Sequence, residues 1–292
     1  RPMSAVTTEL RQDRHVRLGH GLVRALILAF LVLGGVVAVF PYYWMVSNSF
    51  KTDQQIFAWP PLLLPPAPTL DNFTGIFSTQ PFGRWILNSV IVAMFRVPLV
   101  VLLCALGGFA FAKYEFKGRG VLFGIVLGSM MIPFHILLVP LYIFIIRLGL
   151  KDTYITLILP ALASGFGVFL MKQFMMSLPD EMMDAARIDG ASEFGIFWRV
   201  ALPLARPGLA TLTLFTFLSS WNDFIWPLIV LNKKLMYTLP VGLAVLKGHD
   251  LWNTPWGHTM AAAFISSLPI LLIFILMQKQ FISGLHLGSV KG

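Results

Sequence analysis

The chain has 292 residues, of which 57% are hydrophobic and only 12% are charged. A soluble domain carries about 25% charged residues, so this composition excludes an ordinary water-soluble protein and indicates a surface that faces lipid. The net charge of +9 does not indicate a nucleic-acid partner, because the basic residues are scattered between apolar runs and act as topology signals.

Six apolar segments are long enough to cross a bilayer core, which takes ~20 helical residues. Their ranges are 25–44, 86–112, 121–146, 153–171, 207–231 and 259–277. We predict an all-α, polytopic membrane protein with six transmembrane helices, because hydrocarbon cannot satisfy exposed backbone groups and the runs are too long for barrel strands. Gly124 and Gly128, four residues apart, predict close helix packing in the third span.

The distribution of Lys and Arg predicts how these spans are oriented. With the N-terminus inside, the cytoplasmic segments hold 14 of the 22 basic residues, the external segments hold 7, and Arg96 lies within a span. This bias predicts that both termini are cytoplasmic. We therefore predict a cytoplasmic N-terminal tail over 1–24, a membrane domain over 25–282 and a cytoplasmic C-terminal tail over 283–292.

The cytoplasmic loop over 177–206 has the pattern of two short helices around a turn. The sequence Ser177-Leu178-Pro179-Asp180 predicts a capped helix start, and Gly190 predicts a left-handed turn that ends this helix. Ser192 is a predicted cap for a second helix that stops at Pro203.

The second of these helices presents three aromatic side chains, those of Phe194, Phe197 and Trp198, at helical spacing. Exposed aromatic residues in a cytoplasmic loop indicate a surface for a protein partner. The length of the loop points the same way, since connections of this length are usually functional.

The loop also contains a spaced motif. It reads Asp184-Ala185-Ala186, three residues, Gly190, nine residues, and then Val200-Ala201-Leu202-Pro203. This motif resembles the Glu-Ala-Ala loop of the permease subunits of bacterial binding-protein-dependent ABC sugar importers, and more narrowly that of the second permease of maltose-type transporters. Asp184 and Val200 are conservative departures from the family pattern. Further support comes from Asn88-Ser89, Trp221-Asn222-Asp223-Phe224 and the ending Val290-Lys291-Gly292.

The resemblance implies that the loop is a coupling helix, which docks in a groove of a cytoplasmic ATPase subunit, with the acid of the motif near a cation of that subunit. The implied ATPase-coupling residues are Asp184, Ala185, Ala186, Gly190, Phe194, Phe197, Trp198, Arg199, Leu202 and Pro203. The further partners it implies are a second, related permease subunit in a heterodimer, two ATPase subunits, an extracytoplasmic substrate-binding protein and membrane lipid.

The sequence itself argues against ATP hydrolysis by this chain. A phosphate-binding loop needs a Gly-Lys pair, and no Gly-Lys dipeptide occurs. No cofactor is expected in the chain, so ATP and Mg belong to the partner ATPase. The single cysteine, Cys104, and the scattered histidines exclude a metal site by spacing.

The resemblance thus implies a multi-pass permease in the bacterial cytoplasmic membrane, which imports a carbohydrate, a di- or oligosaccharide, by alternating access. Permeases for glycerol phosphate share this loop, so that substrate stays open as an alternative. A membrane scaffold that transports nothing, the alternative from another class, has no need of a coupling loop.

The best candidate for the substrate path is an aromatic and polar cluster in the fifth span. The candidate residues are Trp221, Asn222, Asp223 and Trp226, together with His135 of the third span. Aromatic rings stack on the apolar faces of sugars, while carboxylate and amide groups take the hydroxyls. Two alternatives stay open: an interfacial aromatic belt, and an ion pair between Asp223 and Arg96 that joins two helices.

Overall fold

The computed structural model describes residues 3–246 and 254–287, and every regular element within these ranges is a helix. In chain order the helices are α1 (Met3–Ser49), α2 (Asp53–Ile56), α3 (Asp71–Thr79), α4 (Phe82–Lys113), α5 (Arg119–Met130), α6 (Phe134–Arg147), α7 (Tyr154–Ile158), η1 (Leu159–Leu162), α8 (Gly165–Met176), α9 (Asp180–Ile188), α10 (Glu193–Ile196), η2 (Phe197–Ala201), α11 (Leu202–Leu204), α12 (Arg206–Trp221), α13 (Ile225–Val230), η3 (Lys234–Met236), α14 (Leu239–Leu246) and α15 (Trp256–Leu287). The prediction of an all-α membrane protein is confirmed.

Three stretches of helix are long and apolar enough to cross a bilayer alone: Val23–Ser49, Phe82–Lys113 and Trp256–Gln278. Three more segments pass this test only as bent pairs of helices. The bends measure 97° between α5 and α6, 47° between the Tyr154–Leu162 segment and α8, and 81° between the Glu193–Leu204 and Arg206–Val230 segments. By length and composition the described chain has three to six spans, so the count of six stays a prediction.

The predicted span over 121–146 is two helices rather than one. The chain breaks between Met130 and Phe134, and Pro133 adopts an extended backbone conformation before α6. Proline disfavours helical backbone angles at the preceding residue and cannot donate the next helical hydrogen bond. Pro140, in contrast, lies inside α6.

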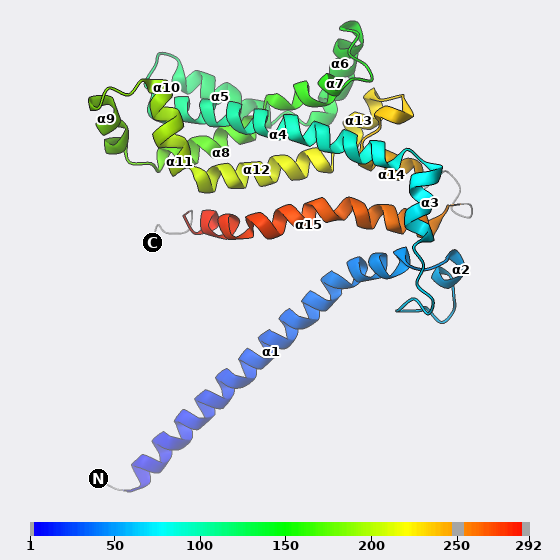
Figure 1. Ribbon diagram of the computed structural model, residues 1–292. Helices are drawn as coiled ribbons and strands as arrows, with labels where there is room; N and C mark the ends of the chain where they lie inside the picture. The colour runs from blue at the N-terminus through cyan, green and yellow to red at the C-terminus, as the bar shows by residue number, and fades with distance from the viewer. Residues whose placement is uncertain (1–2, 247–253, 288–292) are drawn as a thin grey trace.

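The centre of the fold is the packing of α4 against α8 and α12, with α15 alongside α12 (Figure 1). Gly108 of α4 permits the close approach, because a Cβ there would lie 2.6 Å from Cβ of Met171 and 2.7 Å from the backbone nitrogen of Lys172. Small residues at such crossings let helices pack tightly in lipid. The close packing predicted at Gly124 and Gly128 is absent from the described chain, where no atom lies within 4 Å of either Cβ position.

Helix α1 diverges from this bundle and joins it only near its C-terminal end (Figure 1). Its side chains over 23–41 are exposed. Lys51, which is buried, fixes this junction. Its ammonium group donates to Oδ1 of Asn48 at 2.7 Å and to the Leu62 carbonyl at 2.5 Å. The same group lies 4.7 Å from the centroid of the Trp44 ring. Burial lowers the pKa of Lys51.

Both predicted tails are at least partly helical. Helix α1 begins at Met3 and runs without a break into the first span, and α15 continues to Leu287. Residues 288–292 lie outside the described residues, and so does the ending Val290-Lys291-Gly292. The start of α1 and the end of α15 lie on the same side of the molecule as α9 and α10 (Figure 1).

Candidate functional site

The loop over 177–206, called the coupling loop after the role that the resemblance predicts for it, folds as two helices around a left-handed turn. Gly190 has φ +81°, and Ser192 caps the second helix by accepting a hydrogen bond from the backbone N–H of Gly195 at 3.2 Å. The predicted capping box at Ser177 does not form. Its hydroxyl donates to the Phe174 carbonyl instead, and α9 begins at Asp180 without a side-chain cap.

The second helix is continuous through α10, η2 and α11, and Pro203 does not end it as predicted. A π turn over Phe197–Ala201, in which Leu202 donates to the Phe197 carbonyl, directly precedes the proline. Pro203 falls in the first turn of α11, where its missing N–H costs little. The helix ends at Ala205, where the chain bends into α12.

The three aromatic residues of this helix do not share one face. Phe194 is 65% exposed and Trp198 is 44% exposed, whereas Phe197 is only 1% exposed. The Phe197 ring packs against Phe109 of α4, with the ring centroids 5.4 Å apart. The sequence-based expectation that Phe197 faces a partner is therefore wrong for this structure, because the residue anchors the loop to the membrane bundle.

The other predicted coupling residues lie mostly on the surface. Asp184, Ala185, Gly190, Arg199 and Pro203 are exposed, and Ala186 and Leu202 are partly buried. Ala186 packs against the same apolar cluster as Phe197. The exposed members leave a mixed acidic, basic and aromatic surface on one end of the molecule.

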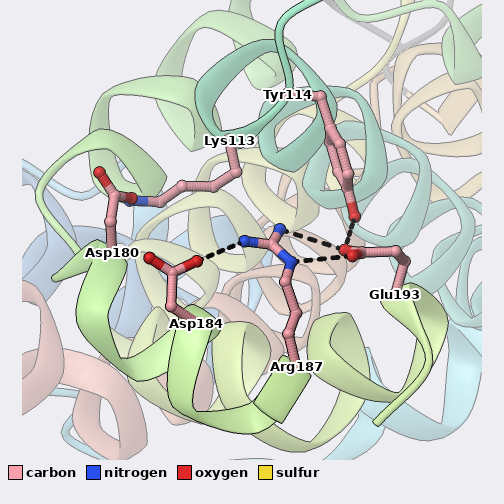
Figure 2. Close-up of polar contacts among 6 residues, drawn as sticks. All are labelled: Lys113, Tyr114, Asp180, Asp184, Arg187 and Glu193. Carbon is pink, nitrogen blue, oxygen red and sulfur yellow. Dashed lines mark hydrogen bonds and ion pairs between the residues drawn. The ribbon is translucent and has the colours of Figure 1, made fainter. Parts of the chain in front are cut away.

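A polar network holds the coupling loop together and ties it to α4 (Figure 2). Arg187 bridges the turn, with contacts of 2.7 Å to Asp184 and 2.9 Å to Glu193. The Tyr114 hydroxyl, directly after α4, donates to Glu193 at 2.5 Å. Lys113, the last residue of α4, donates to the Leu178 carbonyl and to Asp180, both at 2.6 Å. We call the contacts of Lys113 and Tyr114 the α4 clasp.

The network sets the protonation of its members. Hydrogen bonds from Arg187, and then from Tyr114, lower the pKa of Glu193. Burial, and then the hydrogen bond to Glu193, raise the pKa of Tyr114 to about 12. The bond from Lys113 lowers the pKa of Asp180. Tyr114 is therefore protonated and Glu193 ionised at neutral pH, and this combination lets the hydroxyl donate to a carboxylate.

Sequence reasoning missed the α4 clasp. Lys113 and Tyr114 stand at the end of an apolar run, where a basic residue and an aromatic residue are typical membrane-boundary signals. The ion pair between Arg187 and Glu193 could have been predicted from the sequence. The two residues carry opposite charges and lie on either side of the predicted turn at Gly190, which brings them close together.

A second candidate site lies inside the bundle, where two cavities adjoin. The first cavity has a volume of about 350 Å³ and is lined by Arg96, Asp223, Ser164, Ser219, Phe134 and Trp226 among others. The second has a volume of about 260 Å³, shares Arg96, Ser164 and Ser219, and extends along α12 toward the coupling loop past Thr216 and Leu212.

Arg96 and Asp223 form an ion pair at the junction of these cavities. Nη1 of Arg96 lies 2.8 Å from Oδ2 of Asp223, with the side chains 12% and 23% exposed. Of the two alternatives for these residues, the structure shows the pair. Arg96 lines both cavities, and Asp223 lines the first. A charge inside the membrane is stabilised by such a partner.

The remaining residues of the predicted substrate path are spread out. Trp226 lines the first cavity. Trp221 is buried and donates from Nε1 to the Ser266 carbonyl at 2.9 Å, and Asn222 donates to the Leu218 carbonyl. His135 is exposed beside the Phe134 ring. None of these three lines either of the two cavities. Ser164 and Ser219 do so, and single serines in apolar runs gave no sequence signal.

In the part of the chain that the structure describes, no three His, Cys, Asp or Glu side chains lie close enough together to hold a metal ion. The described residues form a mixed charged and aromatic surface at one end of the molecule and a cavity with polar lining within the bundle.

Comparisons with known proteins give one consistent result. Residues 104–286 match the family described as the inner membrane component of binding-protein-dependent transport systems. The chain is 41% identical over 263 residues to the arabinooligosaccharides transport system permease protein AraQ of Halalkalibacterium halodurans, a match that covers 88% of this chain and 92% of that protein. It is 33% identical over 261 residues to the sn-glycerol-3-phosphate transport system permease protein UgpE of Pectobacterium atrosepticum. That match covers 87% of this chain and 93% of UgpE.

The fold has a solved counterpart. A crystal structure of a bacterial ABC transporter involved in the import of the acidic polysaccharide alginate contains a chain that superposes with a TM-score of 0.76. The match covers 90% of this chain and 96% of that one, at 23% sequence identity. At this identity the likeness shows the fold alone.

The family match spans more than half of the chain, and the first relative is similar over nearly its whole length. Permeases of this kind are transport subunits, and ATP hydrolysis in their systems belongs to a separate subunit. The resemblance found in the Asp184–Pro203 motif is thereby confirmed. The chain belongs to the family of inner-membrane permease components of binding-protein-dependent ABC importers.

Proposed function

We propose that this permease imports a carbohydrate, a di- or oligosaccharide, by alternating access. The observation that carries the proposal is the coupling loop: Phe194 and Trp198 are exposed at its surface, and Phe197 and the α4 clasp fix it to the bundle. A docked ATPase that moves such a loop also displaces the contacts that join it to α4. The name of the most similar relative described above, an arabinooligosaccharide permease, supports the substrate class.

The coupling loop supplies the surface for the ATPase partners. Residues Phe194 and Trp198 fit an apolar groove, and the free oxygen of Asp184 is exposed for a cation of the ATPase. ATP and Mg are bound by two such subunits, outside this chain. With six spans and the bias of basic residues, both termini and the coupling loop are cytoplasmic in this proposal. The start of α1, the end of α15 and the helices α9 and α10 lie on one side of the molecule in Figure 1, which supports it.

The pathway is completed by a second, related permease subunit, and the pair forms a heterodimer. Helix α1 supports this arrangement, because its side chains over 23–41 are exposed and the helix diverges from the bundle (Figure 1). An extracytoplasmic binding protein delivers the sugar to the pair. A solved complex that contains a structural relative includes an alginate-pentasaccharide-bound periplasmic protein.

Glycerol phosphate is the alternative substrate, since a relative of 33% identity is named for it. The charge of the cavities disfavours it. Arg96 is the only cation among their lining residues, and Asp223 already neutralises it.

The test is reconstitution of the chain with its partner permease, ATPase subunits and binding protein in proteoliposomes. We expect uptake of an oligosaccharide that depends on ATP and on the binding protein, and ATP hydrolysis stimulated by the loaded binding protein. Uptake of sn-glycerol 3-phosphate in place of sugars contradicts the substrate class. Stimulated hydrolysis that persists when this chain is omitted contradicts the coupling role.

The α4 clasp makes a further prediction. Tyr114→Phe removes the hydroxyl that donates to Glu193 and leaves the ring in place against Phe109. Because a hydrogen bond contributes about 0.5–1.5 kcal/mol net, we expect stimulated ATP hydrolysis to fall about threefold at unchanged membrane abundance. The matched control is Tyr43→Phe, which loses a bond of 2.8 Å to the Leu63 carbonyl at the opposite end of the molecule. Equal hydrolysis by the two variants contradicts a role of the clasp in coupling.

A further inference from the structure

Arg96, near the middle of the 32-residue helix α4, lines both cavities and pairs with Asp223, which lines the first cavity. We propose that this pair is a binding site for a neutral sugar, which it holds by two neighbouring hydroxyl groups. The inference rests on the proposed function of carbohydrate import. It assigns a substrate contact, and a preference for uncharged sugars, to this subunit itself.

Both members of the pair have hydrogen-bonding capacity left. The contact uses Nη1 of Arg96 and Oδ2 of Asp223, which leaves Oδ1 of the carboxylate as an acceptor. Nε of Arg96 is buried and has no hydrogen-bond partner among the described residues. A buried donor without a partner is costly in a low-dielectric site. One sugar hydroxyl can accept from the guanidinium while its neighbour donates to the carboxylate, so a pair of adjacent hydroxyls satisfies both groups.

The wall of the first cavity fits the rest of a sugar ring. Trp226 and Phe134 line it, with ring centroids 6.3 Å apart in an edge-to-face arrangement. Nε1 of Trp226 donates to the Thr156 carbonyl at 2.8 Å, which fixes the indole. Phe134 is 43% exposed and offers its ring to the apolar C–H face of a sugar, whereas Trp226 is only 3% exposed and supports the Phe134 ring. The volume of about 350 Å³ falls in the range of small-molecule sites, about 300–1,000 Å³.

The charge of the site selects the ligand class. Arg96 and Asp223 are the only ionised side chains among the lining residues of both cavities, so the formal charges there cancel. A phosphate or carboxylate ligand placed against Arg96 also approaches Asp223, and the two negative charges repel each other. A neutral polyhydroxyl ligand avoids this repulsion.

Ser164 and Ser219 line both cavities and therefore mark the passage between them. Ser219 lies in α12 four residues before Asp223, which follows the end of that helix. Ser164 caps α8 by accepting from the Gly167 N–H at 3.1 Å. A ligand released from the pair in the first cavity meets these hydroxyls on its way into the second. The ion pair is thus one of the binding sites along the transport pathway.

The decisive variant is the double change Arg96→Met with Asp223→Leu, studied in the complete reconstituted complex with wild-type partners. Because both partners of this partly buried pair are replaced together, no unpaired charge is left in the bundle, so the complex is expected to assemble in normal amounts. Uptake of tritiated arabinotriose, xylotriose or maltotriose, whichever the wild type transports, is expected to fall at least about tenfold, because hydrogen bonds to two charged groups are lost. A purely structural ion pair predicts normal uptake by the double variant.

A second variant keeps the test decisive if the double variant assembles poorly. Ser219→Leu leaves the ion pair intact and fills the passage between the cavities, so uptake is expected to fall by about tenfold. The matched control is Ser78→Leu, at an exposed position of α3 outside both cavities, which should transport normally. Normal uptake by Ser219→Leu, like normal uptake by the double variant, overturns the assignment.

The wild-type complex separates this inference from the proposed function. If it transports none of the three sugars, carbohydrate import itself is wrong. If it transports sn-glycerol 3-phosphate at a comparable rate to a sugar, the preference for neutral ligands is wrong while transport stands. If it transports a sugar and the variants do so equally well, only the binding role of Arg96 and Asp223 fails.

Discussion

Gly190→Val is expected to abolish the stimulation of ATP hydrolysis by the loaded binding protein, with a fall of at least about tenfold. Gly190 has φ +81°, a conformation that costs other residues about 1–2 kcal/mol and is worse for a β-branched side chain. The turn at Gly190 sets the angle between α9 and α10, and Arg187 and Glu193 face each other across it. Valine shifts this angle and separates the exposed aromatic residues from the acids of the motif.

The matched control for this variant is Gly118→Val. Gly118 also has positive φ, +85°, also lies in a turn between helices, and also has open space around its Cβ position. It precedes α5 and is not part of the coupling loop. We expect it to keep most of the stimulation. If both variants lose stimulation equally, general backbone strain explains the result and the coupling assignment of Gly190 is contradicted.

Gly108→Leu is expected to prevent the accumulation of folded permease. A Cβ at this position meets both the Met171 side chain and the backbone of Lys172 at under 3.0 Å, so α4 and α8 have to separate along their main contact. Over-packing costs about 1–3 kcal/mol where side chains can adjust, and here backbone atoms oppose the change. We expect a destabilisation at the upper end of that range. The measurements are the abundance of the permease in the membrane and the thermal stability of the purified complex, and both are expected to fall strongly.

Gly83→Leu provides the comparison within the same helix. Its Cβ position is 3.7 Å from the Phe77 ring, an ordinary contact, and the residue is exposed. This variant is expected to accumulate normally. Normal abundance of Gly108→Leu shows that α4 and α8 do not pack as closely as described.

The parts of the coupling loop that depend on neighbours in sequence could be predicted. The turn at Gly190 and the cap at Ser192 are local features, and both are present. The burial of Phe197 could not be predicted, because the spacing of three aromatic residues does not say which face of the helix meets Phe109. Pro203 was predicted as a stop, but the preceding π turn shifts it into the first turn of a new helix segment.

Among the residues that line the two cavities, some could also be predicted from the sequence and others could not. Arg96 and Asp223 could be identified from the sequence because charged residues within membrane spans are rare. Their pairing across 127 residues was one of two open alternatives. Ser164 and Ser219 have no such signal, since their place at the junction of two cavities arises only from helix packing. Trp221 carried the right residue type for a sugar site, but its indole is used to bind the Ser266 carbonyl between α12 and α15.

Helix α4 joins the coupling loop to the ion pair, and Pro98 within it gives the helix a point at which it can bend. From Lys113 to Arg96 the helix rises about 25 Å at 1.5 Å per residue, and Pro98 interrupts its hydrogen-bond ladder two residues from Arg96. Bending of a helix concentrates at such a point. If the coupling loop tilts α4 as proposed, bending at Pro98 changes the distance between the Arg96 guanidinium and the Asp223 carboxylate.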